Sequence, residues 1–231
     1  MHDTVARIIR NWLGQFEGPV REMYLDNRGF VTTGVGTLLQ SAHDANGYRW
    51  ERIAGGAASQ PEVATEFERV RSPETKRKIP GWAVMGGANF IKSATRLGIV
   101  TLRLTADSVD KMFQDKLASL ETTMKGTPGY EEYEDFPGDA QIGIISVIWA
   151  NGAGAQNVGP QKQDLRLHRT WPGFTGACER RAWLEIADRK HYKWTNIRDD
   201  RNKATERVFR NADIVENDEN APQSTVLDRV P

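Results

Sequence analysis

The sequence has only one cysteine, no long apolar segment and no excess of charge of either sign. A single cysteine, Cys178, cannot form an internal disulfide, and its helical context is typical of a small buried apolar side chain. No run of residues is long and apolar enough to span a membrane. The first residues also lack the basic, apolar and small-residue order of a signal peptide. We therefore expect synthesis and folding in the cytoplasm, without membrane insertion.

The charge pattern also excludes several classes of partner. Lysine and arginine together number 31, as do aspartate and glutamate, so the formal net charge is zero. The basic clusters at 76–78, 180–181 and 198–210 are interleaved with or flanked by acids, which favours solvated, ion-paired surfaces over nucleic-acid binding. The four histidines have no metal-ligand spacing, and no Gly-x-Ser-x-Gly elbow occurs. We expect no metal, no cofactor and no nucleic-acid partner.

The hydrophobic pattern predicts a mainly helical chain with a small hairpin. Apolar residues repeat at helical spacing from Val5 to Phe16, just before Gly18-Pro19. β-forming residues then flank the turn Asp26-Asn27-Arg28-Gly29, which predicts a β-hairpin. The combination indicates an α+β fold. Further helices are predicted near residues 63–71, 105–120, 139–149, 176–189 and 199–211.

The same pattern suggests a division of the chain. Residues 1–45 form a first lobe, and 99–212 form a helical second lobe. Glycine pairs and prolines interrupt 46–98, which we interpret as an insertion or an elaborated linker between the lobes. Residues 213–231 are polar and are expected to be a mobile tail.

Three side chains near the hairpin have the types that glycoside hydrolysis needs. That reaction requires a proton donor and a second carboxylate that activates water, stabilises charge or attacks the sugar. Glu17 follows the first helix, Asp26 occupies the turn and Thr32 lies on the return strand. Apolar neighbours would favour the protonated form of Glu17. Spacing alone leaves the alternative open that these are a helix cap and two turn residues.

The full string FEGPVREMYLDNRGFVTTGVGTLL resembles the N-terminal lobe of the phage-type lysozymes, glycoside hydrolase family 24. The resemblance implies a lysozyme-like two-lobed fold with Glu17 as catalytic acid, and with Asp26 and Thr32 holding a water. The motif glycines fall on Gly29, Gly34 and Gly36, while Thr37 stands where the family has a bracing histidine.

Later segments are similar to the family as well: LTADSVDKMFQDKL, DAQIGIISVIWANGAG and DDRNKATERVFRNA. The last similarity puts Arg201 in the place of the arginine that pairs with the catalytic glutamate, although a solvated helix-face charge is an equal alternative. The resemblance also implies contacts with the glycan; the expected substrate-binding residues are Gly36, Leu38, Trp149 and Asn151.

The activity so implied is hydrolysis of the β-1,4 bond between N-acetylmuramic acid and N-acetylglucosamine, with inversion and without a metal or organic cofactor. A monomer acting on peptidoglycan in the periplasm is expected, after release as a phage endolysin or delivery as an antibacterial effector. A delivery apparatus or an immunity protein would then be a partner, with 46–98 as a docking surface. The alternative is a non-catalytic glycan-binding or structural module on a lysozyme scaffold.

Overall fold

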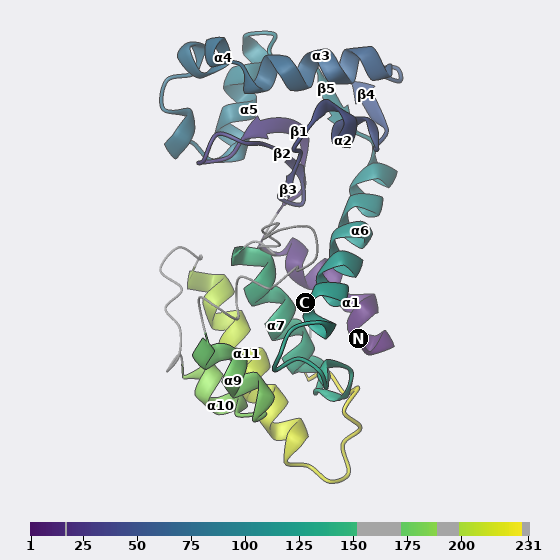
Figure 1. The fold of residues 1–231 in the computed structure, drawn as a ribbon, viewed down its shortest axis with the longest axis vertical. Helices are drawn as coiled ribbons and strands as arrows, with labels where there is room; N and C mark the ends of the chain where they lie inside the picture. Colours follow the sequence, from purple (N-terminus) through teal and green to yellow (C-terminus); the bar gives the residue numbers. More distant parts are fainter. Residues whose placement is uncertain (17, 152–171, 189–198, 228–231) are drawn as a thin grey trace. The chain divides into compact units, whose positions relative to one another are not determined.

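Helices dominate the computed structural model, which describes residues 1–16, 18–151, 172–188 and 199–227 (Figure 1). Helix accounts for 59% and strand for 10% of the described residues, so the expected mainly helical α+β class is confirmed. The strands of the described residues form two small antiparallel sheets. None of the helices described there has the length and apolar character that crossing a membrane would require.

The elements cluster into two compact units. We call Glu17–Lys116 the hairpin unit, and Met1–Phe16 together with Leu117–Pro231 the helical unit. The long helix α6 (Ala106–Lys125) contributes residues to both. The expected first lobe at 1–45 is therefore divided, because its opening helix belongs with the C-terminal part of the chain.

That opening helix, α1 (Asp3–Gly14), buries its apolar face against α7 (Gly138–Asn151). Its residues Ile9 and Trp12 are almost completely inaccessible to solvent. The backbone amide of His2 donates to Gln141 Oε1 at 2.9 Å, which fixes the start of α1 on α7. Periodicity predicted the buried face correctly, but the partner of that face lies far along the chain.

The predicted hairpin is confirmed. Strands β1 (Val20–Leu25) and β2 (Val31–Gly34) are antiparallel, and β3 (Thr37–Leu38) pairs with the other side of β2. In the turn between β1 and β2, the Gly29 amide donates to the Asp26 carbonyl at 2.9 Å. Gly29 has φ 83°, in the region that favours glycine.

The rest of the hairpin unit covers the sheet with short helices, and its second sheet is a pair of short strands in which Trp50 lies opposite Leu104. The elements are α2 (Ala42–Asn46), β4 (Trp50–Arg52), α3 (Gln60–Arg71), α4 (Pro73–Lys78), η1 (Trp82–Val84), α5 (Gly87–Arg96) and β5 (Leu102–Leu104).

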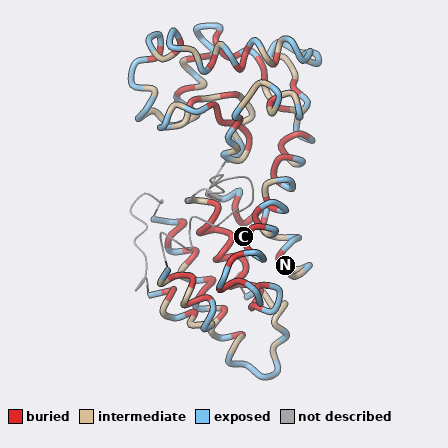
Figure 2. Tube along the Cα trace, viewed as in Figure 1, coloured by how far each residue is buried: buried red, intermediate tan, exposed pale blue. Residues whose placement is uncertain are grey.

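The interpretation of 46–98 as a linker between lobes is wrong. Phe67 of α3 and Phe90 of α5 are buried in the same apolar cluster as Met23 and Leu25 of the hairpin. Figure 2 shows buried positions, in red, throughout this unit. Burial of these side chains stabilises the unit, since each fully buried aromatic or leucine contributes about 1.5–3 kcal/mol. The segment supplies seven of the eighteen buried residues of this cluster, so it is an integral part of the hairpin unit.

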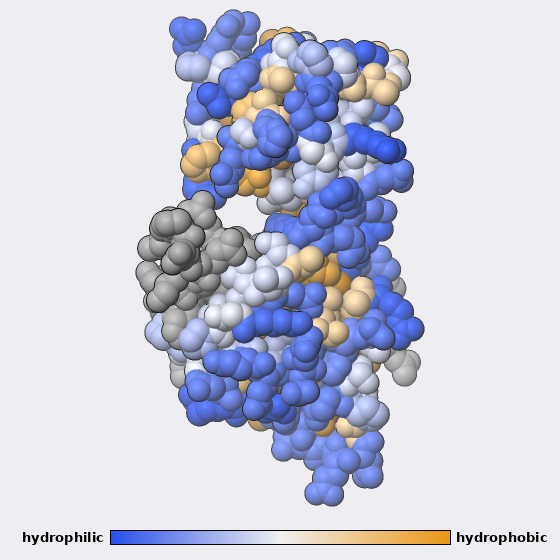
Figure 3. Space-filling view, turned by 45° about the vertical axis from the view of Figure 1, so that its right-hand side comes forward, coloured by the Kyte–Doolittle hydropathy of each residue, from blue (hydrophilic) through white to orange (hydrophobic). Residues whose placement is uncertain are grey.

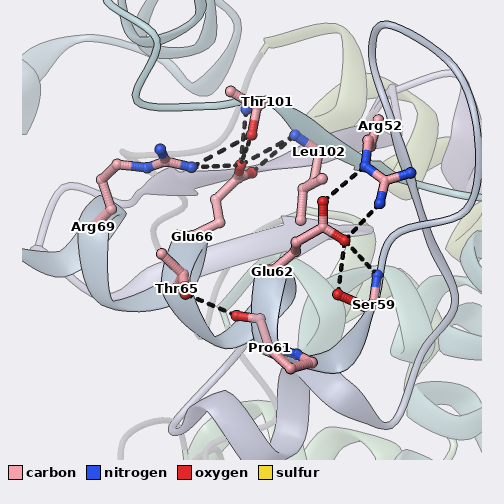
Figure 4. Close-up of polar contacts among 9 residues, drawn as sticks. All are labelled: Arg52, Ser59, Pro61, Glu62, Thr65, Glu66, Arg69, Thr101 and Leu102. Carbon is pink, nitrogen blue, oxygen red and sulfur yellow. Dashed lines mark hydrogen bonds and ion pairs between the residues drawn. The ribbon is translucent and has the colours of Figure 1, made fainter.

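Two carboxylates attach α3 to its surroundings (Figure 4). Glu66, fully buried, accepts hydrogen bonds from the Thr101 amide at 2.8 Å, the Thr101 hydroxyl at 2.7 Å and the Leu102 amide at 3.1 Å. Glu62 caps the helix start at Ser59 and holds Arg52 through two hydrogen bonds, at 2.7 and 2.8 Å. The Arg52 guanidinium and the Ser59 donors lower the pKa of Glu62 to about 2.

The helical unit is built around α7, which is buried on nearly all sides as its sequence predicted. Gly143 lets α11 approach, because a Cβ at that position would lie 2.7 Å from the Phe209 ring. Trp183 stacks on Phe209 at a centroid distance of 6.2 Å. Besides α1, α7 and the end of α6, the described elements are η2 (Tyr133–Asp135), α9 (Pro172–Glu179), α10 (Trp183–Ala187) and α11 (Asp199–Glu216).

Two expectations for the helical unit need correction. The helix predicted at 176–189 is interrupted between α9 and α10, where Arg181 has φ 54° and breaks the helical hydrogen-bond pattern. The expected tail from residue 213 first continues α11 and then returns to the start of α7. The Gly138 amide donates to the Gln223 carbonyl at 2.8 Å, and the Leu227 amide donates to Asp139 Oδ2 at 2.6 Å.

Candidate functional site

The predicted acid, Glu17, lies outside the described residues, but its neighbour Phe16 is described. The Phe16 ring contacts Trp12 of α1 edge-on, at a centroid distance of 5.0 Å. The guanidinium carbon of Arg201 lies 5.9 Å from the centroid of the Phe16 ring. A positive charge therefore lies against the residue that directly precedes Glu17 in the chain.

Arg201 itself is a buried residue of α11, with 4% of its surface exposed. Its Nη2 donates to the Ser146 carbonyl of α7 at 2.9 Å, and its Nε donates to the Ser146 hydroxyl at 3.2 Å. The alternative of a solvated helix-face charge is therefore wrong. Burying a guanidinium costs free energy unless it is hydrogen-bonded and paired. The hydrogen bonds to Ser146 offset part of that cost and fix the position of the Arg201 side chain.

Asp26 has one oxygen committed to the turn. Its Oδ1 accepts hydrogen bonds from the backbone amides of Arg28 and Phe30, both at 2.9 Å. Its Oδ2 lies 3.7 Å from the Arg28 guanidinium, and 21% of the side chain is exposed. Asp26 also lines a pocket of about 440 Å³ with Tyr24 and Val84. Oδ1 therefore stabilises the turn, and this structural role does not rule out a catalytic role for Oδ2.

Thr32 is held in the middle strand of the three-stranded sheet. It lies opposite Tyr24 on β1 and opposite Leu38 on β3, and 5% of its surface is exposed. Its hydroxyl donates to the Phe30 carbonyl at 3.5 Å, which is a long and weak hydrogen bond. The Thr32 hydroxyl is therefore fixed in place by the sheet more than by its own hydrogen bond.

The glycines of the motif all have the backbone conformation that glycine permits. Besides Gly29, Gly34 has φ 60° and Gly36 has φ 73°, and both lie at the tight connection from β2 to β3. Lys116 of α6 donates to the carbonyls of Val35 and Gly36 at that connection. Sequence reasoning missed Lys116, because a lysine on a mostly apolar helix face is usually a solvated side chain.

Of the expected glycan contacts, Leu38 has the most suitable surroundings. It is 39% exposed and lines a pocket of about 490 Å³ with Phe30, Phe67 and Arg71. Trp149 is 4% exposed in the helical unit, so its contact with a glycan stays a prediction. The side chain of Asn151 lies outside the described part of the chain.

The remaining candidates behave as ordinary structural residues. Burial raises the pKa of the Cys178 thiol, in keeping with a small buried apolar side chain. Lys78 pairs with Glu74 at 2.7 Å, and Lys203 pairs with Asp199 at 2.8 Å, so these basic clusters form ion pairs as predicted. Hydrophilic residues predominate on the face shown in Figure 3. Within the described ranges, no group of three or more His, Cys, Asp or Glu residues could hold a metal ion.

The site residues thus fall into two groups. Asp26, Thr32, Gly36 and Leu38 all belong to the hairpin unit, where Thr32 lies opposite Leu38, whereas Arg201 belongs to the helical unit. Comparison with known proteins identifies no relative: no family model, no curated protein and no solved structure matches the chain.

Proposed function

We propose that the chain is a muramidase with a lysozyme-like two-lobed fold, which hydrolyses the β-1,4 bond between N-acetylmuramic acid and N-acetylglucosamine. One observation carries the proposal. The segment that resembles the phage-type lysozymes forms a hairpin with a carboxylate, Asp26, in its turn and a hydroxyl, Thr32, on its return strand. The three motif glycines in it have the positive φ angles that this backbone requires.

In the proposed reaction, Glu17 protonates the glycosidic oxygen as the bond to the leaving sugar breaks. Asp26 and Thr32 hold a water on the opposite face of the ring, and Asp26 accepts the proton of that water as it attacks C1. Attack from the opposite face inverts the anomeric configuration. The resemblance implies that Arg201 pairs with Glu17 and orients its carboxyl group. The positive charge would also favour the ionised form of Glu17, which opposes the effect of apolar neighbours. Side chains alone supply the acid and the base.

The biological setting follows from the substrate. Peptidoglycan lies in the periplasm, so the enzyme would act there after release by a phage lysis system or delivery by a secretion system. The balanced charge gives no attraction to the anionic wall, which favours an effector whose delivery apparatus supplies the targeting. An immunity protein would be its partner in that case, and the enzyme would act as a monomer.

The direct test is to identify the sugar ends that the protein produces from purified peptidoglycan. We expect muropeptides with N-acetylmuramic acid at the new reducing end, formed first as the α anomer. An N-acetylglucosamine reducing end or a 1,6-anhydro product would contradict the assigned bond and mechanism. Binding to peptidoglycan without release of any product would favour the non-catalytic module instead.

Two substitutions of Asp26 separate its catalytic role from its structural one. Asp26→Asn retains an oxygen for the Arg28 and Phe30 amides, so the melting temperature should change little. Hydrolysis should nevertheless fall by about 10²–10⁴-fold, because an amide cannot accept the proton of the attacking water. Asp26→Ala should also lose about 1–3 kcal/mol of stability, since two amides lose their acceptor. Kinetics and thermal denaturation measure both effects, and full activity of Asp26→Asn would make Asp26 a turn residue only.

A further inference from the structure

The connection between β2 and β3 is held from outside by α6. The Lys116 Nζ donates to the Val35 carbonyl at 3.0 Å and to the Gly36 carbonyl at 3.4 Å. One helical turn before Lys116, the buried Met112 lies against the same connection, because a Cβ at Gly34 would overlap the Met112 sulfur. Two side chains of one helix face therefore fix consecutive residues of this turn, one by hydrogen bonds and one by packing.

At the end of this turn that leads into β3, the described residues make few other anchoring contacts. The Thr37 hydroxyl is buried without a hydrogen-bond partner in the described part of the chain, so this side chain does not tether the turn. β3 consists of only two residues, Thr37 and Leu38, at the edge of the sheet. Such a short edge strand has few ladder hydrogen bonds of its own, and its position depends on what anchors the residues before it.

The position of this turn matters because β3 faces the candidate site. Leu38 lies directly opposite Thr32, and Thr37 lies opposite Thr33. A shift of the Val35–Gly36 backbone would therefore move Leu38 and loosen the strand that supports Thr32. Catalytic groups tolerate such movements poorly, since a misplacement of about 1 Å can lower a rate by about 100-fold.

We propose that Lys116 is a positioning residue of the muramidase site: by holding the Val35 and Gly36 carbonyls, it sets the place of β3 and thereby of Thr32 and Leu38. The proposal rests on the proposed function for its effect on catalysis. Its structural part does not, because it also requires that the β2–β3 connection loosens whenever Lys116 loses its donors.

The test uses Lys116→Met, which keeps an unbranched side chain only one atom shorter and removes its charge and donors. We expect kcat on peptidoglycan to fall about tenfold or more, with a smaller change in KM and a melting temperature close to that of the wild type. Lys116→Arg can still donate to both carbonyls and should restore most of the rate. The matched control is Lys111→Met, an exposed lysine on the same helix that pairs with Asp115, and it should leave kcat unchanged.

Amide hydrogen exchange provides a second readout that needs no activity. The Leu39 amide donates to the Val31 carbonyl, so it reports directly on the attachment of this edge. Lys116→Met should speed exchange at Leu39 and at the neighbouring β3 amides, while amides of β4 and β5 stay protected. Unchanged exchange, or no rescue by arginine, would overturn the positioning role. An inactive wild type with faster exchange in Lys116→Met would instead refute only the proposed function.

Discussion

Replacement of Glu17 by glutamine is expected to lower peptidoglycan hydrolysis by about 10²–10⁴-fold, the range that a general acid contributes. Glutamine keeps the size of the side chain but carries no proton that it can transfer to the glycosidic oxygen. Asp26 and Thr32 would still hold the water, so the remaining rate is that of an unprotonated leaving group. The loss should fall on kcat more than on KM, because the proton moves in the transition state.

The measurement is muropeptide release from purified peptidoglycan under saturating and limiting substrate. A suitable control is Glu74→Gln, which neutralises a carboxylate on α4 whose side chain is 61% exposed. Both variants should keep the melting temperature within a few degrees of the wild type, since the amide of the introduced glutamine can still accept a hydrogen bond. Equal release by the wild type and Glu17→Gln would refute the assignment of Glu17 as the acid.

Replacement of Glu66 by alanine is expected to destabilise the hairpin unit by about 1–3 kcal/mol. The carboxylate is fully buried and is the acceptor for the Thr101 amide, the Thr101 hydroxyl and the Leu102 amide. The amide of the buried Leu102 would remain without an acceptor, whereas Thr101 is exposed and its donors can bind water. Arg69, whose Nη2 lies 3.2 Å from the carboxylate, would lose its counter-charge as well. A loss of this size is a large part of the stability of an ordinary domain.

Urea denaturation followed by tryptophan fluorescence and far-ultraviolet circular dichroism measures this loss. Glu68→Ala is the control, because Glu68 lies on the same helix with its side chain 57% exposed and pairs only at the surface with Arg71. An exposed pair contributes up to about 1 kcal/mol. If Glu66→Ala destabilised the protein no more than Glu68→Ala, the buried carboxylate would not be what joins α3 to β5.

The pH dependence of the free energy of unfolding should also reflect the titration of Glu66. Burial raises the pKa of Glu66, and the hydrogen bonds from Thr101 and Leu102 oppose that rise. The folded protein then retains the Glu66 proton to a higher pH than the unfolded chain does. The contribution of this group to stability is therefore greatest below its unfolded pKa, decreases as the pH rises to its folded pKa, and is level above it. Glu66→Gln should lack this component.

Local signals in the sequence predicted much of the fold. The apolar residues of α7 and the turn at Asp26–Gly29 specify their structures through near neighbours, so these elements could be read directly. The pairing of β4 with β5 could not, because each strand has three residues and the partner lies about fifty residues away. The burial of Glu66 was equally hidden, since its acceptor role depends on Thr101 and Leu102, which lie far along the chain.

The candidate site divides in the same way. The hairpin carrying Asp26 and Thr32 was predicted from turn chemistry and glycine spacing, and its geometry follows those signals. Periodicity could not distinguish a buried Arg201 from a solvated one, because its burial depends on Ser146 and Phe16, which lie far from it in the sequence. The contact of Lys116 could not be predicted either. Its acceptors are backbone carbonyls, which every residue has, so no residue type in the sequence indicates them.

The attachment of α1 to the C-terminal helices has a consequence for how the chain folds as it is made. The hairpin unit is one continuous stretch, so all of its contacts become available as soon as Lys116 has left the ribosome. α1 is made before the hairpin unit, whereas α7, which covers its apolar face, is made after it. The apolar side chains of α1 must remain uncovered during that interval, available to chaperones. The hairpin unit can therefore fold before α1 reaches its native position, which requires that α7 has been synthesised.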